Sequence, residues 1–151
     1  MDILIIEDDL VVAHNMKEII EGIGPNKAHV AKNDKEAFEL VKMYRPNLFL
    51  TDISLADSDL DGISIMEKIS ETHHAPLIYT SALSDHHTRS RAKKTKPVAY
   101  LVKPFSARQL EVAIDFALLN QHDHHPDTYV EIDHQPMITE TDYVYVKGKN
   151  E

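Results

Sequence analysis

Asn47-Leu-Phe-Leu-Thr-Asp-Ile-Ser54 is an apolar run that ends in polar residues and delivers a carboxylate, Asp52. Continuous apolar runs of this length are typical of strands buried on both faces of a parallel sheet. Three other stretches have the same order of apolar run and polar end: 3–6 before Glu7-Asp8-Asp9, 77–79 before Thr80-Ser81, and 98–102 before Lys103-Pro104. The carboxyl ends of parallel strands meet at one edge, where open α/β sheets bind ligands. The sequence therefore predicts one site with carboxylates, a hydroxyl and an ammonium.

Helices are predicted between these runs, because apolar residues recur there at helical spacing. The predicted helices cover 10–23, 33–44, the residues after Gly62, 86–96 and 106–119, and a weak strand is predicted at 28–31. The expected caps are Asn33 or Asp34, Ser84 or Asp85, and Ser106. Strand and helix thus alternate five times, which predicts an α/β fold with a doubly wound parallel sheet and helices on both faces.

The helix predicted at 86–96 differs from the others because it has almost no apolar stripe. Only Ala92 is available to pack against a core. A helix held by so few apolar contacts is expected to shift easily between conformations.

Composition limits the classes of function. The chain has 151 residues, 42% of them hydrophobic, and a formal net charge of -9. This charge argues against nucleic-acid or anionic-membrane binding by the chain as a whole. The lack of cysteine excludes disulfides and thiolate chemistry. No leader pattern and no apolar run of about 18 residues is present, so we expect a soluble, cytoplasmic protein with no membrane segment.

The composition changes at Gln121, which predicts a domain of residues 1–120 followed by a linker and C-terminal tail, residues 121–151. Two short strands are predicted in this tail, at 129–132 and 143–146. Three interpretations remain open: the tail is disordered, or it forms a strand pair packed on the body or a partner, or it begins a second domain, truncated here.

Residues 1 to about 120 resemble the receiver domain of two-component response regulators, the CheY-like family. The resemblance rests on features in a fixed order: the acidic residues after the first strand, Asp52 ending the third, a Ser or Thr ending the fourth, and Tyr-x-x-Lys-Pro around the fifth. It implies a flavodoxin-like fold of five parallel strands in the order 2-1-3-4-5. It also implies a signalling domain that accepts a phosphoryl group from a sensor histidine kinase or histidine phosphotransfer protein, and that is not a dedicated enzyme.

The resemblance assigns roles to the residues of the site. Asp52 resembles the phosphoacceptor and Lys103 the lysine that pairs with it. Glu7, Asp8, Asp52 and the backbone carbonyl of Ser54 resemble the ligands of Mg²⁺ or Mn²⁺. Chemistry agrees, because a carboxylate that attacks phosphorus needs cations to offset the phosphoryl charge, and Mg²⁺ prefers oxygen ligands.

The switch residues also follow from the resemblance. Thr80 and Ser81 are adjacent, and strand side chains alternate, so one of them faces the site. The spacing to Lys103 favours Ser81. Tyr100 resembles the aromatic switch residue, and Pro104 follows Lys103 through a peptide that is cis in the family. We expect Ser81 to approach the phosphoryl group and Tyr100 to follow, which would repack the fourth helix.

Two expectations concern assembly and output. The basic run 89–96 and the acids Glu111 and Asp115 predict a phosphorylation-dependent homodimer. The segment Asp142-Tyr-Val-Tyr-Val-Lys-Gly-Lys149 is similar to the first strand of LytTR-type DNA-binding domains. DNA binding and transcription regulation are therefore expected only through an effector domain that lies beyond this chain.

Two alternative functions remain. Aspartyl-phosphate phosphatases that use Mg²⁺ also place an aspartate at a strand end. These enzymes share a second aspartate two residues later, which acts as a general acid, and this chain has Ser54 in that position. A pseudo-receiver would bind a partner without phosphorylation, and the set of Asp8, Asp52 and Lys103 argues against it.

Overall fold

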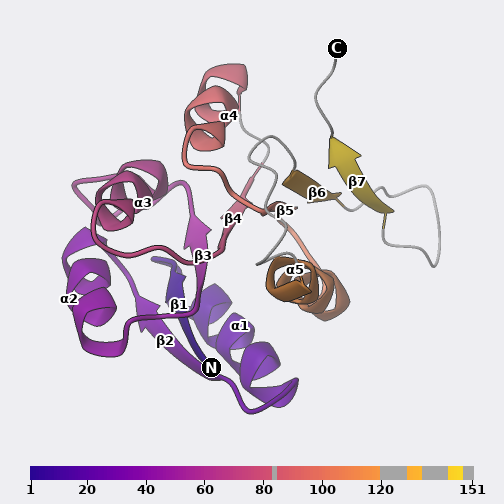
Figure 1. Cartoon of the computed structure of the whole chain (residues 1–151), viewed down its shortest axis with the longest axis horizontal. Helices are drawn as coiled ribbons and strands as arrows, with labels where there is room; N and C mark the ends of the chain where they lie inside the picture. The colour runs from indigo at the N-terminus through magenta and orange to yellow at the C-terminus, as the bar shows by residue number, and fades with distance from the viewer. Residues whose placement is uncertain (83–84, 120–128, 134–142, 148–151) are drawn as a thin grey trace.

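A computed structural model of the chain describes residues 1–82, 85–119, 129–133 and 143–147. The elements in chain order are β1 (Asp2–Ile6), α1 (Leu10–Gly22), β2 (Lys27–Ala31), α2 (Asp34–Tyr44), β3 (Leu48–Asp52), α3 (Gly62–Ser70), β4 (Leu77–Ser81), α4 (His86–Lys93), β5 (Ala99–Val102), α5 (Ala107–Leu119), β6 (Tyr129–Asp133) and β7 (Tyr143–Lys147). Figure 1 shows the sheet running between helices on its two faces. Among the described helices, none has the length and apolarity needed to cross a membrane.

The sheet has the predicted order. Strands β2, β1, β3, β4 and β5 are neighbours in that order and pair in parallel. The sheet then continues beyond the predicted fifth strand, because β6 pairs in parallel with β5 and β7 pairs antiparallel with β6. Ile132 of β6 is fully buried in the hydrophobic core that lies between the sheet and helices α1 and α5. The described residues of the tail, β6 and β7, thus form a strand pair at the edge of the sheet. The division into a domain of residues 1–120 and a tail that begins an effector domain stays a prediction.

Each face of the sheet has its own hydrophobic core. Helices α1 and α5 cover one face, and α2, α3 and α4 cover the other (Figure 1). The packing of β1 shows why its apolar run is unbroken. Ile3 and Ile5 point into the core on the side of α1 and α5, and Leu4 and Ile6 point into the core on the side of α2, α3 and α4. Because successive side chains of a strand face opposite sides, a strand covered on both faces needs apolar residues at every position.

The helix caps settle the alternatives left by the sequence. Asn33, not Asp34, caps α2 through a hydrogen bond from the Glu36 N–H at 3.0 Å. Asp85 caps α4, while Ser84 lies outside the described residues. At α5, Ser106 and Gln109 accept hydrogen bonds from each other's N–H, at 3.1 and 2.8 Å. This reciprocal pair is a capping box, which confirms Ser106 as the predicted cap.

Helix α4 is attached to the body by few contacts. Ala92 is its only buried residue, as predicted, and the helix ends at Lys93 instead of Lys96. Arg91 is not free to pair with a second copy, because its guanidinium binds both carboxylate oxygens of Asp61, at 2.7 and 3.3 Å. Asp61 also caps α3 by accepting a hydrogen bond from the Ser64 N–H at 2.8 Å. One carboxylate therefore fixes the start of α3 and holds α4 against it.

Replacing Arg91 with Gln is expected to lower the free energy of unfolding by about 1 kcal/mol near neutral pH, because the ion pair is two-pronged but partly exposed. Burial raises the pKa of Asp61, but its bonds to Arg91 and to the Ser64 N–H outweigh this and lower the pKa overall. A lowered pKa stabilises the fold above the unfolded value, about 3.9, and this contribution disappears as the pH falls through the folded value.

Urea denaturation of wild type and Arg91→Gln between neutral and acidic pH tests this prediction. The stability difference should be largest near pH 7 and vanish in acid. Lys35→Gln is the matched control. Lys35 is exposed, and its substitution removes the same charge without breaking the contact between Arg91 and Asp61. A difference that is constant with pH, or equal in the control, would contradict an ion pair as the cause.

Candidate functional site

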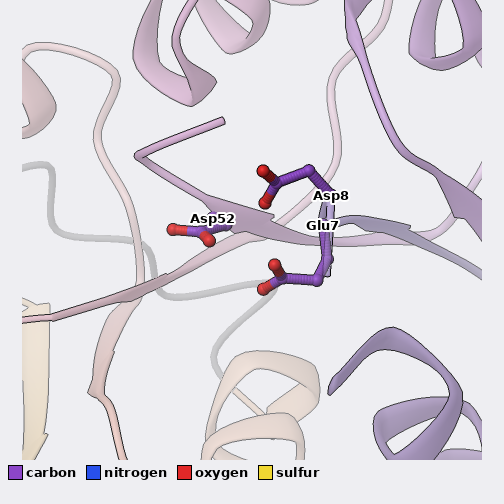
Figure 2. A group of neighbouring side chains, drawn as sticks. All are labelled: Glu7, Asp8 and Asp52. Atoms are coloured by element: carbon purple, nitrogen blue, oxygen red, sulfur yellow. The ribbon is translucent and has the colours of Figure 1, made fainter. Parts of the chain in front are cut away.

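The acidic residues predicted for the site meet at the carboxyl edge of the sheet. Glu7 and Asp8 directly follow β1, and Asp52 is the last residue of β3, the neighbour of β1. One carboxylate oxygen of each residue lies within 4.8 Å of the others. Figure 2 shows the three carboxylates gathered on the same side of the strand ends. Three carboxylates converging in this way fit a divalent cation with oxygen ligands, such as Mg²⁺.

Lys103 reaches the same cluster from the end of β5, which is separated from β1 by β3 and β4 in the sheet. Its Nζ donates to Glu7 Oε2 at 2.7 Å and to Asp52 Oδ2 at 2.9 Å. Burial lowers the pKa of the ammonium, but these two hydrogen bonds outweigh it and raise the pKa overall. The ammonium therefore stays charged beside Asp52.

Glu7 has the most perturbed carboxylate of the cluster. It is 1% exposed. Burial, reinforced by the nearby charge of Asp52, raises the pKa of Glu7 to about 7, although the hydrogen bond from Lys103 opposes this. A second positive charge between the carboxylates would offset both effects, because burial and like charges each disfavour the ionised form. The donor set thus fits a metal ion electrostatically as well as chemically.

Asp8 is held by the loop that follows β3. Its Oδ2 accepts a hydrogen bond from the Ala56 N–H at 2.8 Å. Burial raises the pKa of Asp8, but the bond from Ala56 contributes to an overall lowering, so the carboxylate is ionised at neutral pH. Asp9 has a different task, since its Oδ1 accepts from the N–H groups of Val11 and Val12 and caps α1.

The two hydroxyls at the end of β4 lie in different environments. Thr80 is 1% exposed and is the register partner of Asp52. Ser81 lines a cleft together with Ser54, and its Oγ donates to the Ala82 carbonyl at 2.6 Å. Ser81 is therefore the hydroxyl that a ligand in the cleft can reach, and its role at the phosphorylation site stays a prediction.

Tyr100 lies under α4. It is 6% exposed, belongs to the same core as Ala92, and its ring centroid lies 5.7 Å from that of Tyr79. The aromatic residue that the resemblance assigns to the switch is therefore already buried. The Lys103–Pro104 peptide is cis, as the resemblance implies.

Gly62 is a structural requirement of the site that the sequence did not reveal, because Asp61-Gly62 has the pattern of an ordinary turn. Its N–H donates to the Ile53 carbonyl at 2.8 Å. A Cβ at this position would lie 2.0 Å from the carbonyl oxygen of Asp52. The start of α3 is therefore packed directly against the backbone that carries Asp52.

Comparisons with known proteins match this architecture. The family model for the response regulator receiver domain matches residues 3–115. The transcriptional regulatory protein PdtaR of Mycobacterium tuberculosis is 31% identical over 116 residues, which cover 77% of this chain and 56% of that protein. The phyllosphere-induced regulator PhyR of Methylorubrum extorquens is 31% identical over 121 residues, 80% of this chain and 44% of that protein.

Solved structures agree. The signal receiver domain of a modulated diguanylate cyclase from Desulfovibrio desulfuricans G20 superposes with a TM-score of 0.72 at 30% identity, covering 79% of this chain and 94% of that one. The NtrX receiver domain of Brucella abortus gives 0.72 at 25% identity, covering 78% and 98%. The chain spans about half the length of the two regulators named above. With the receiver model covering most of its length and the predicted strand order observed, this chain belongs to the response regulator receiver family of two-component systems.

Proposed function

We propose that this receiver accepts a phosphoryl group on Asp52, with Mg²⁺ or Mn²⁺ held by Glu7, Asp8, Asp52 and the backbone carbonyl of Ser54. The observation that carries the proposal is the contact between Lys103 and Asp52 inside a cluster of three carboxylates. A carboxylate that must receive a phosphoryl group needs permanent positive charge at hydrogen-bond distance, and Lys103 provides it.

In the proposed reaction, a carboxylate oxygen of Asp52 forms a bond to phosphorus while the bond between phosphorus and the donor's imidazole nitrogen breaks. The electron pair of that bond stays on the imidazole, which takes up a proton. A metal ion held by Glu7, Asp8 and Asp52 would supply positive charge that offsets the charge of the phosphoryl oxygens. Lys103 orients Asp52 before transfer and pairs with a phosphoryl oxygen afterwards, and the Ser81 hydroxyl donates a hydrogen bond to another phosphoryl oxygen.

The phosphodonor, a sensor histidine kinase or a histidine phosphotransfer protein, has an apolar surface to bind next to this site. Leu10 and Val11, at the start of α1, are 62% and 80% exposed. They line a cavity of about 870 Å³ with Lys103, Pro104 and Phe105. Because the donor's histidine must reach Asp52, a docking surface that includes Lys103 is well placed for transfer.

For the output, we propose that Ser81 moves to the phosphoryl group and α4 repacks against Tyr100. The few contacts of α4 support this, because a helix with one buried residue is displaced at low cost. The proposed phosphorylation-dependent homodimer pairs the basic run 89–96 of one copy with Glu111 and Asp115 of a second copy. Because Arg91 already pairs with Asp61 within the chain, the other cations of this run would make the contacts between copies. We infer that DNA binding takes place through an effector domain and not through the receiver itself.

The phosphatase alternative is disfavoured by Ser54. Such enzymes have a second aspartate two residues after the nucleophile, and this chain has Ser54 there. The backbone N–H of Ser54 donates to Asp52 Oδ1 at 3.1 Å. A serine hydroxyl is a poor general acid at neutral pH, because its proton is not released in that range.

Intact-protein mass spectrometry tests the proposal. Incubation with acetyl phosphate and Mg²⁺ is expected to add the mass of one phosphoryl group, and EDTA is expected to abolish the gain. The adduct should be lost in base or hydroxylamine, as an acyl phosphate is. A pseudo-receiver predicts no gain under any of these conditions, and an adduct that forms equally in EDTA would contradict the metal's role.

A further inference from the structure

A cavity of about 460 Å³ opens at the amino-terminal edge of the sheet. Its lining comes from the three segments that lead into β3, β4 and β5, namely residues 45–47, residues 73–76, and Lys96 with Val98, and from Ala117 of α5. Asp52 and Lys103 lie at the opposite ends of the same strands. Since a five-residue strand is about 16 Å long, this cavity is a separate place from the phosphorylation site.

The charged residues that line the cavity are all basic. Arg45 and Lys96 are its two permanent cations and His73 and His74 add imidazoles, while none of the described residues that line it is acidic. This is unexpected in a chain with a net charge of -9. Within the described part of the chain, neither Arg45 nor Lys96 has an ion-pair or hydrogen-bond partner for its side chain. Two cations around one concave surface create a positive potential there.

The backbone presents both cations in the same way. Arg45 is the C-cap residue of α2 with a φ of 48°, and Lys96 lies three residues after the end of α4 with a φ of 54°. Each is followed by a buried proline, Pro46 or Pro97, that leads into the next strand. Glycine adopts this left-handed conformation without steric cost, yet both positions hold long cations. The dipole of each helix favours a cation at its own end, but it does not explain why both cations line one cavity.

His73 is held in place at the cavity wall. Its Nε2 donates to the Pro46 carbonyl at 2.6 Å, and its ring packs edge-on against Phe49. Because a carbonyl only accepts hydrogen bonds, Nε2 carries the proton, and Nδ1 remains for another partner. The wall is therefore ordered before any ligand arrives, which reduces the entropy lost on binding.

We propose that this cavity binds a small organic phosphate. A guanidinium and an ammonium are the side chains best suited to a phosphate group. Ala75, Pro76 and Val98 provide an apolar surface for the organic part of the ligand. The volume lies within the range of small-molecule sites, about 300–1,000 Å³. The site does not depend on phosphorylation of Asp52.

The test is an NMR titration of the full ¹⁵N-labelled chain with AMP, which carries a phosphate dianion and a planar base. EDTA keeps divalent ions away from the carboxylate cluster. Saturable shifts are expected at the amides of Asn47, His74 and Val98. Arg45→Gln and Lys96→Gln should each weaken the affinity roughly tenfold, since each removes one charge-assisted contact.

Lys42→Gln is the matched control, because Lys42 lies on the last turn of α2, is exposed and does not line the cavity. Its affinity for AMP should equal that of the wild type, and adenosine, which lacks the phosphate, should produce no saturable shift. The proposal is overturned if AMP shifts only residues at the opposite edge of the sheet, if adenosine binds as tightly as AMP, or if Arg45→Gln keeps wild-type affinity. The amide spectra themselves show whether each variant is folded.

Discussion

Asp52→Asn is expected to reduce the phosphoryl gain from acetyl phosphate to zero. An amide oxygen is not a nucleophile of useful strength, whereas the shape of the side chain is nearly unchanged. Lys103 keeps its second partner, Glu7, at 2.7 Å, so the site should stay assembled in the variant. Intact mass spectrometry in Mg²⁺, with and without hydroxylamine treatment, measures the result directly.

Asp57→Asn is the control for this substitution. Asp57 is exposed and lies in the loop after β3, so its substitution removes the same charge from the same part of the chain. The control should gain one phosphoryl group at the wild-type rate. A hydroxylamine-sensitive adduct on Asp52→Asn would show that another carboxylate, with Glu7 and Asp8 the candidates in the same cluster, is the acceptor, and it would refute the assignment of Asp52.

Gly62→Ala is expected to destabilise the fold by about 3 kcal/mol, the upper part of the range for overpacked positions. The new Cβ would lie 2.0 Å from the carbonyl oxygen of Asp52 and 2.9 Å from its carbonyl carbon. These are backbone atoms of β3, so they cannot move aside as a flexible side chain would. The melting temperature should fall by roughly 10 °C for a domain of this size. Any phosphorylation that remains should be slower, because relief of the clash displaces Asp52.

Gly22→Ala tests whether this effect is specific to the site. Gly22 is the last residue of α1, and nothing lies within 4 Å of a Cβ built there. Because alanine favours helix over glycine, this variant should be as stable as the wild type or more stable by up to about 1 kcal/mol. Similar stability losses in both variants, measured by urea denaturation, would contradict the proposed contact between α3 and β3.

The strands and the residues of the site were accessible from the sequence because their signals are local. An unbroken apolar run such as Ile3–Ile6 predicts a strand covered on both faces, and the structure places alternate residues in two cores. The polar residues that end these runs, Asp52 and Lys103 among them, lie together because parallel strands end at one edge. The strand order and the chemical roles followed from the family resemblance, and the structure confirms the order.

Only the tertiary structure decided the contacts between residues distant in sequence. The bond from Lys103 to Glu7, the ion pair of Arg91 with Asp61, and the pairing of β6 with β5 each depend on how separate elements pack. The same is true of Gly62, which has the sequence pattern of a turn and becomes indispensable only where β3 approaches it. Local sequence determines what each segment can form, whereas distances between segments result from the packing of the whole chain.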